Sequence, residues 1–161
     1  MLPEIKKDIT TVTKGVVCHG VNCRRAMGSG VALAIKTQWP DVYKTYMSSG
    51  QGPDMLGNTV VLQVTPQVFV ANCYTQLDFK GYHRFVLKDD ETEDILAQPE
   101  AISTSMRYAF TQAKSFGLPL YLPKIGSGLG GLEWARDVYP IIDVLTNIDF
   151  PDVDTTICIW P

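Results

Sequence analysis

Short apolar runs alternate along this chain with longer segments in which apolar residues recur three and four positions apart. The short runs are rich in β-branched and aromatic residues and are bounded by Gly, Pro, Asp or Asn, a pattern that predicts strands. The longer segments have the periodicity of amphipathic helices. The predicted strands are Gly15–Val21, Asn58–Val64, Val68–Tyr74, Pro119–Pro123 and Thr155–Trp160, and the predicted helices are Ser29–Gln38, Asp41–Ser48, Pro99–Phe116 and Glu133–Leu145.

Local signals refine the ends of these elements. Ser29 is a suitable N-cap, and Pro99 suits a first helical turn. Gly117 and Gly50 stand where helices close in a left-handed residue. The segment Ile5–Val12 is partly β-branched but carries three charged residues, so it is compatible with a further strand.

The order of the elements predicts an α/β layered architecture, because strands alternate with helices. The two adjacent strands around Pro66 predict an antiparallel hairpin, so the sheet should be mixed. With 161 residues, 45% of them hydrophobic, the chain can build one core, and we expect a single domain over residues 1–161. The acidic stretch Lys88–Asp94 is expected to be a solvated loop.

Charge and composition narrow the class of partner. Fourteen Lys and Arg against seventeen Asp and Glu give a net charge of −3, which offers no overall attraction to a nucleic acid. No apolar run reaches eighteen residues and no signal peptide is present, so we expect a soluble cytoplasmic or otherwise intracellular protein without a membrane partner. The four cysteines, which form no CxxC pair, are expected to be reduced core thiols: Cys18, Cys23, Cys73 and Cys158.

The first chemical signal is the turn Gly28-Ser29-Gly30 between a predicted strand and a predicted helix. Glycines allow close backbone approach to a ligand, and the free N–H groups of the helix start bind phosphate. An ordinary glycine-rich turn explains this segment equally well.

A second glycine loop follows the predicted strand Pro119–Pro123. Gly126, Gly128 and Gly131 formally satisfy GxGxxG, but no acidic residue ends a following strand as a dinucleotide-binding Rossmann domain requires. Two separate glycine loops in one small α/β domain instead fit a diphosphate that is held from both sides.

The nucleophile and metal signals are weaker. Cys18 and Arg24 have the spacing of Cys-dependent phosphatases, but the cysteine lies at the apolar end of a strand, which favours coincidence. His19 and His83 are the only histidines and neither has a partner at metal-ligand spacing, so we predict no metal site and no cofactor. His19 is either a neutral core residue or a functional group that Asn22 follows on the same strand edge.

With both loops located, the sequence from Asp8 to Trp160 resembles the macro domain family. Lys7-Asp8-Ile9-Thr10 resembles the Gly-Asp-Ile-Thr segment whose aspartate and following N–H contact adenine. Val21-Asn22 resembles the strand end that carries an asparagine to the distal ribose. Gly28 to Ala32 and Ile125 to Leu132 resemble the two diphosphate loops.

Within that family, Cys18 to Cys23 is most similar to the ADP-ribose-1''-phosphate phosphatases that carry a histidine three residues before the asparagine. Two alternatives stay open: a reader module without turnover, and an ADP-ribosyl hydrolase. The hydrolases that act on modified glutamate use a lysine after the middle strand and an aspartate in the second loop, and those positions correspond here to Gln76 and Gly130. Leu132 stands where many members have an aromatic residue.

The resemblance implies a three-layer α/β/α macro domain with a mixed, mostly parallel sheet of about six strands. It implies a monomer that binds a small ADP-ribose derivative or an ADP-ribosylated protein, and hydrolysis of ADP-ribose 1''-phosphate with either P–O or C–O cleavage. The residues it assigns to catalysis are His19 and Asn22, and those it assigns to substrate binding are Asp8, Ile9, Gly28, Ser29, Gly30, Val31, Ile125, Gly126, Ser127, Gly128, Leu129, Gly130, Gly131 and Leu132.

Overall fold

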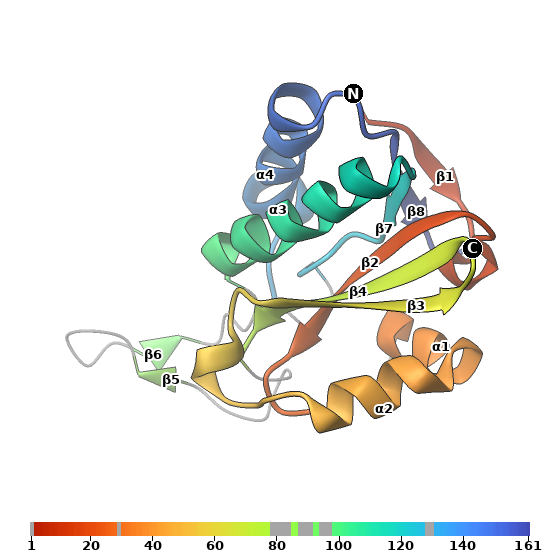
Figure 1. Cartoon of the computed structure of the whole chain (residues 1–161). Helices are drawn as coiled ribbons and strands as arrows, with labels where there is room; N and C mark the ends of the chain where they lie inside the picture. The colour runs from red at the N-terminus through yellow and green to blue at the C-terminus, as the bar shows by residue number, and fades with distance from the viewer. Residues whose placement is uncertain (1, 29, 78–84, 87–91, 94–97, 128–130) are drawn as a thin grey trace.

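The centre of the molecule is a six-stranded mixed sheet (Figure 1). The computed structural model describes residues 2–28, 30–77, 85–86, 92–93, 98–127 and 131–161. In spatial order the strands are β1 (Glu4–Lys6), β8 (Thr155–Ile159), β7 (Leu120–Leu122), β2 (Gly15–Asn22), β4 (Val68–Gln76) and β3 (Thr59–Thr65). Neighbouring strands are parallel except for the edge strand β3, which runs antiparallel to β4.

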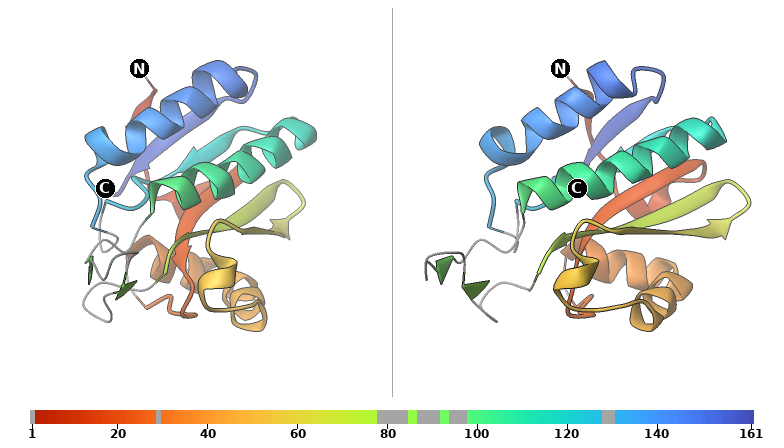
Figure 2. Two further views of the ribbon diagram at one scale, coloured as in Figure 1. Left: turned by 90° about the vertical axis from the view of Figure 1, so that its left-hand side faces the viewer. Right: turned by 60° about the vertical axis from the view of Figure 1, so that its left-hand side comes forward.

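Helices cover both faces of this sheet, as Figures 1 and 2 show. One layer contains α1 (Gly30–Gln38) and α2 (Pro40–Ser48), and the other contains α3 (Pro99–Phe116) and α4 (Tyr139–Val144). Side chains alternate along β2, so Val16 and Cys18 pack in the α3–α4 layer while Val17 and Val21 pack in the α1–α2 layer. The predicted three-layer α/β/α architecture with a mixed sheet is therefore confirmed.

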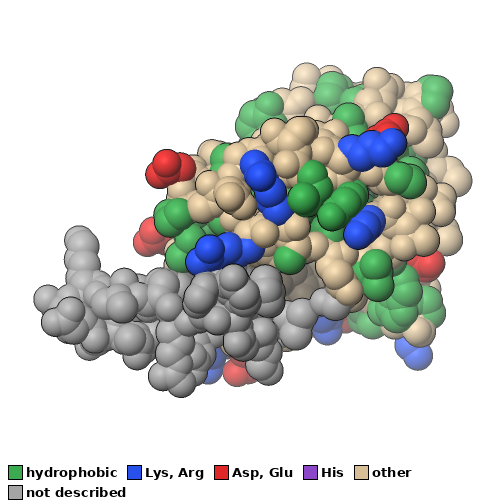
Figure 3. Space-filling view, turned by 90° about the horizontal axis from the view of Figure 1, so that it is seen from below, with side chains coloured by type: hydrophobic (Ala, Val, Ile, Leu, Met, Phe, Trp, Pro, Cys, Tyr) green, Lys and Arg blue, Asp and Glu red, His purple; other side chains and the backbone are tan. Residues whose placement is uncertain are grey.

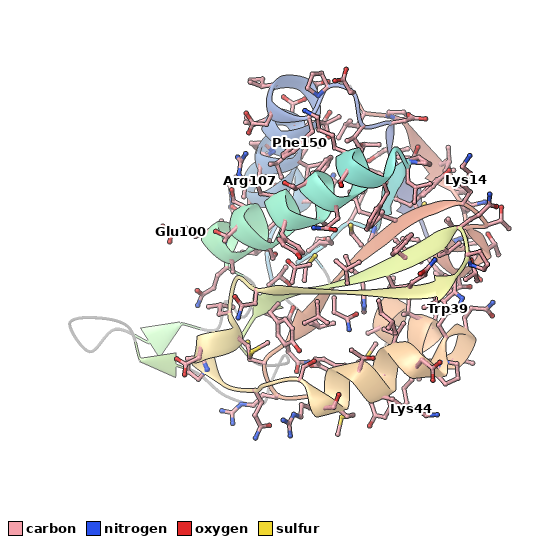
Figure 4. All side chains as sticks on the ribbon, viewed as in Figure 1. Lys14, Trp39, Lys44, Glu100, Arg107 and Phe150 are labelled. Atoms are coloured by element: carbon pink, nitrogen blue, oxygen red, sulfur yellow. The ribbon has the colours of Figure 1, made fainter. Side chains whose placement is uncertain are left out.

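Several local predictions are also confirmed. The long helix α3 has its predicted bounds and ends at Gly117, whose φ of 66° is left-handed. The hairpin around Pro66 is the antiparallel pair β3–β4. The final helical segment extends beyond the prediction, because α4 is flanked by the π-helical turns η4 (Trp134–Val138) and η5 (Leu145–Asp149). Arg107 on α3 binds Asp149 at 2.8 Å beside Phe150, which ties this segment to α3 (Figure 4).

Two predictions were wrong in detail, and a third is mostly untested. Helix α2 ends at Ser48 without a left-handed glycine, because Ser49 closes it with an N–H bond to the carbonyl oxygens of Thr45 and Tyr46. The segment Ile5–Val12 is not one strand: β1 ends at Lys6, and Ile9–Thr11 form the 3-10 turn η1. Most of the predicted acidic loop Lys88–Asp94 lies outside the described residues; within it, Thr92–Glu93 form β6, a strand paired with β5 (Phe85–Val86).

The chain also contains a short 3-10 turn, η2 (Pro53–Met55), between α2 and β3. Trp39 connects α1 to α2 beneath the sheet (Figure 4) and is buried. None of the described helices combines the length and apolar character that crossing a membrane requires.

Candidate functional site

The predicted ligand-binding segments gather at one edge of the sheet because five of its strands are parallel. The carboxyl ends of β1, β8, β7, β2 and β4 share that edge, which is where open α/β sheets bind ligands. Asp8 follows β1, the first glycine loop follows β2, and the second follows β7. Since β2 and β7 are hydrogen-bonded neighbours, the two loops leave the sheet from adjacent positions.

The first loop begins with a turn that Asn22 organises. Its Oδ1 accepts from the backbone N–H groups of Arg24 (2.9 Å) and Ala26 (3.3 Å), and its Nδ2 donates to the Ala26 carbonyl oxygen (2.9 Å). Gly28 has open space where a Cβ would stand, and Gly30 begins α1 with a φ of 59°. Ser29 lies outside the described residues, so the predicted N-cap there is not tested.

The second loop is closed by a backbone bond from the Leu132 N–H to the Gly126 carbonyl oxygen (2.8 Å). Gly126 and Gly131 both have positive φ, 79° and 81°, which favours glycine at these two positions. Ser127 uses its hydroxyl locally, donating to the Lys124 carbonyl oxygen at 2.6 Å. The predicted ligand contacts Gly128, Leu129 and Gly130 lie outside the described residues.

Asp8 serves first as the cap of η1. Its Oδ1 accepts from the backbone N–H (2.9 Å) and the hydroxyl (2.6 Å) of Thr10, so Oδ2 is the carboxylate oxygen left for a further donor. Asp8 also lines a cavity of about 570 Å³ together with Gln38 and Trp39. These two residues lie at the end of α1 away from its glycine loop, so this cavity does not join Asp8 to the loops.

Trp160 is a candidate site residue that the sequence reasoning did not single out. It follows β8 and is 53% exposed. The pairing of Lys6 with Ile159, together with the bond from the Lys7 N–H to the Ile159 carbonyl oxygen (2.9 Å), places Trp160 next to the residues that lead into Asp8. An exposed indole face beside a free carboxylate oxygen suits a planar base. The aromatic residue that ends the last predicted strand was the signal that could have identified it.

His19 lies deeper than the loops. It is 1% exposed, and its Nε2 is 2.6 Å from Oδ1 of Asn72, the residue that pairs with it on β4. Because an amide oxygen only accepts, Nε2 carries the proton and Nδ1 is an acceptor, which is buried without a partner. Burial lowers the pKa of His19 to about 4, although the Asn72 bond opposes the shift. The imidazole is therefore neutral at pH 7.

Comparison with known proteins fits this geometry. No protein-family model matches the chain. The macrodomain protein of Streptomyces coelicolor superposes with a TM-score of 0.71 at 24% identity, covering 98% of each chain. The chain has the macrodomain fold. The structure of Thermosipho africanus DarTG in complex with ADP-ribose contains the same fold, with a TM-score of 0.69, 20% identity and coverage of 97% of this chain and 40% of that one.

A curated relative matches this chain over part of a longer protein. The DNA ADP-ribosyl transferase-DNA ADP-ribosyl glycohydrolase fusion protein of Thermosipho africanus is 26% identical over 137 residues, which are 81% of this chain. The matched region is 35% of the fusion protein, so this macrodomain spans about a third of the length of that relative.

The predicted binding residues differ in which of their atoms, side chain or backbone, can reach a ligand. The side chains of Ile9, Ile125 and Leu132 are buried in the hydrophobic core, so only their backbone atoms can reach a ligand. Val31 is half-buried against the α1–α2 layer. The absence of the aromatic residue at Leu132 therefore does not open the loop, because the leucine packs inward.

Cys18 does not have the environment of a nucleophile. It is fully buried in the α3–α4 layer, and desolvation together with neighbouring Cys73 raises the pKa of its thiol well above the usual value. A thiol held in its neutral form cannot supply the thiolate that the Cys-x5-Arg chemistry needs. The four cysteines are free and buried, as predicted.

The residues described by the structure include no cluster of three or more His, Cys, Asp or Glu side chains that could hold a metal ion. Of the two histidines, only His19 is among them. Among the predicted site residues that the structure describes, the polar groups are backbone amides, the Asp8 carboxylate, the Asn22 carboxamide, the Ser127 hydroxyl and the buried neutral His19 imidazole. This set suits recognition of a phosphorylated nucleotide and movement of a proton or water.

Proposed function

We propose that this macrodomain binds ADP-ribose, or a derivative of it, across the carboxyl edge of the sheet. The observation that carries the proposal is the exit of two glycine loops from neighbouring parallel strands, one of them opening directly into α1. Such a pair can grip a diphosphate with backbone N–H groups without any net positive charge on the protein. The ADP-ribose complex of the Thermosipho africanus protein, which has the same fold, supports this ligand.

The proposed assignments follow the positions of the elements. The backbones of Gly28 to Val31 and of Ile125 to Leu132 hold the diphosphate. Asp8 Oδ2 and the Ile9 N–H hold the adenine, and Trp160 lies against its ring. Asn22 contacts the distal ribose. These contacts come from the positions of the residues and from the family resemblance.

The adenine assignment predicts that Asp8→Asn weakens ADP-ribose binding about tenfold to a hundredfold, as expected for the loss of a charged hydrogen-bond acceptor. An asparagine keeps an oxygen for the Thr10 cap and replaces the second oxygen with a donor, so η1 should persist. Isothermal titration calorimetry measures the affinity, with Asp54→Asn on η2 as the control.

Unchanged affinity in Asp8→Asn would remove Asp8 from the site. No heat from the wild-type protein at high ADP-ribose concentration would contradict the ligand itself.

For the reaction, we propose hydrolysis at the distal ribose of ADP-ribose 1''-phosphate, to give ADP-ribose and inorganic phosphate. The support is the similarity of His19 and Asn22 to the phosphatase branch. Water supplies the oxygen that replaces the broken bond, and the diphosphate grip holds the anomeric phosphate at a fixed distance. Reaction in ¹⁸O-labelled water separates the two routes, because the label enters phosphate if P–O cleaves and the ribose hydroxyl if C–O cleaves.

A second candidate is removal of ADP-ribose from a modified macromolecule, favoured by the name of the curated relative, a DNA ADP-ribosyl glycohydrolase fusion. The face of the molecule shown in Figure 3 carries several Lys and Arg side chains despite the net charge of −3. Arg24 and Arg25 precede the first glycine loop, and Lys36 and Lys44 lie on α1 and α2. These cations can attract a nucleic-acid backbone locally.

One assay separates the two candidates. The protein is incubated in parallel with ADP-ribose 1''-phosphate, ADP-ribosylated DNA and a glutamate-ADP-ribosylated protein, and phosphate and free ADP-ribose are measured. We expect phosphate release, and Cys18→Ser should keep it because the buried thiol has no catalytic role. Release of ADP-ribose from DNA alone would instead favour the glycohydrolase. In that case Lys80→Ala is the first variant to test. Lys80 is the first lysine in the sequence after β4, four residues past Gln76, and it lies outside the described residues.

A further inference from the structure

Hydrogen bonds from two neighbouring segments form a frame around the turn that leads from β2 to the first glycine loop. On one side, the Cys23 N–H bonds to the carbonyl oxygens of Gln76 (3.1 Å) and Leu77 (3.2 Å) at the end of β4. On the other, Nε and Nη2 of Arg25 donate to the Ser49 carbonyl oxygen, at 3.2 and 2.6 Å, where α2 ends. The end of α2 and the end of β4 thus fix this turn from both sides.

The backbone of this turn adopts a conformation that other residues avoid. Arg25 has a φ of 61°, and it is the only non-glycine residue with positive φ in the described part of the chain. A left-handed conformation is unfavourable for a residue with a side chain, because its Cβ comes too close to the following carbonyl oxygen. Such outliers persist where surrounding contacts determine them, and they concentrate at ligand sites.

The frame sets the direction of the Asn22 carboxamide. Oδ1 is surrounded by three donors: the N–H groups of Arg24 and Ala26 and the hydroxyl of Tyr46 (2.9 Å). Nδ2 has two hydrogens and uses one, for the Ala26 carbonyl oxygen. The oxygen is therefore fully engaged within the protein, and one N–H is left over. Asn22 can act toward a ligand only as a hydrogen-bond donor.

Tyr46 is the one side chain in this frame that approaches both oxygens of Asn22. Its hydroxyl lies 2.5 Å from the main-chain oxygen and 2.9 Å from Oδ1. The ring is fully buried on α2 with its centroid 5.9 Å from that of Tyr74. Burial, and to a smaller extent Tyr74, raises the pKa of Tyr46, so the hydroxyl keeps its proton and remains a donor.

We propose that Tyr46 is a positioning residue that fixes Asn22 as a donor to the distal ribose of the bound ligand. This inference rests on the proposed function, because Asn22 is its contact to that ribose. Without the Tyr46 hydroxyl, the main-chain oxygen and Oδ1 of Asn22 lose the single proton that lies between them, and only the backbone groups of Arg24 and Ala26 still hold the carboxamide. The effect should be confined to the part of the ligand that Asn22 contacts.

The test compares two ligands that differ by the distal ribose. Tyr46→Phe removes the hydroxyl and keeps the buried ring, and calorimetry measures its affinity for ADP-ribose and for ADP. We expect affinity for ADP-ribose to fall about tenfold, the loss of one well-placed hydrogen bond, while affinity for ADP changes less than twofold. Tyr43→Phe is the matched control on the same helix, where Lys36 lies over the ring, and it should change neither affinity.

The possible outcomes distinguish a failure of the Tyr46 proposal from a failure of the proposed function. Equal losses for both ligands would show a merely structural role and overturn the proposal, as would no loss for either. If the wild-type protein binds neither ligand, the proposed function fails and this inference fails with it.

If Tyr46→Phe does not fold, a measurement on the wild-type protein still tests the contact between Asn22 and the distal ribose that the proposal requires. The side-chain NH₂ resonances of Asn22 should shift on addition of ADP-ribose and stay in place on addition of ADP. Identical shifts with both ligands would overturn the proposal.

Discussion

His19→Gln is expected to lower kcat for release of phosphate from ADP-ribose 1''-phosphate by about 10² to 10⁴, the usual contribution of a general acid-base group. Glutamine can keep a donor for Asn72 Oδ1 but has no lone pair in the place of Nδ1. ADP-ribose affinity should change little, because the proposed diphosphate and adenine contacts lie elsewhere. Steady-state kinetics with phosphate detection, paired with calorimetry, measures both quantities.

The environment of His19 defines what that role can be. With a pKa of about 4 the ring is neutral at pH 7, so it can accept a proton from water but is poorly suited to protonate a leaving group. Nδ1 is buried, and the role therefore requires that water or substrate reach an atom that solvent does not touch in this structure. His83→Gln is the control. Full activity in His19→Gln would leave the imidazole with a purely structural role.

The second large effect concerns stability against acid. The folded pKa of His19, about 4, lies below the unfolded value of 6.5, so the unfolded chain binds more protons between these two pH values. The free energy of unfolding should consequently fall as pH drops from about 6.5 to 4, and His19 alone should contribute a loss of about 3 kcal/mol. Urea denaturation at pH 7, 5.5 and 4.5 measures this change.

The comparison with a variant isolates His19 from the carboxylates that titrate near the same pH. His19→Gln should be less stable than wild type at pH 7 and should lose less stability on acidification, since its side chain does not titrate. Parallel pH profiles of the two proteins would contradict the buried neutral histidine.

Much of the fold could be predicted from sequence because its signals are local. Pro99 and Gly117 mark the two ends of α3 through fixed φ at one end and left-handed φ at the other. The hairpin around Pro66 follows from two strand patterns with too little chain between them for a crossover. Gly50 misled the prediction because a serine, Ser49, ends α2 in an extended conformation and satisfies the last carbonyl oxygens itself.

Only those features of the candidate site that follow from the order of strands and loops along the chain could be predicted from the sequence. Loops that follow parallel strands meet at one edge, so the two glycine segments could be joined from sequence. The burial of His19 could not, because it depends on which β4 residue stands opposite, and Asn72 is 53 positions away. The Tyr46 contact with Asn22 likewise connects α2 to β2 through tertiary packing that no local pattern encodes.

The pairing of His19 with Asn72 also bears on how β2 finds its register against β4 during folding. A slip of two residues would keep every side chain on its own face of the sheet, so valines such as Val17 and Val70 discriminate weakly against it. It would, however, place His19 opposite Val70 or Tyr74 and leave a buried imidazole N–H without its acceptor, at a cost of roughly 1–3 kcal/mol. The buried His19–Asn72 pair thus favours the observed register of β2 and β4 over registers that are shifted by two residues.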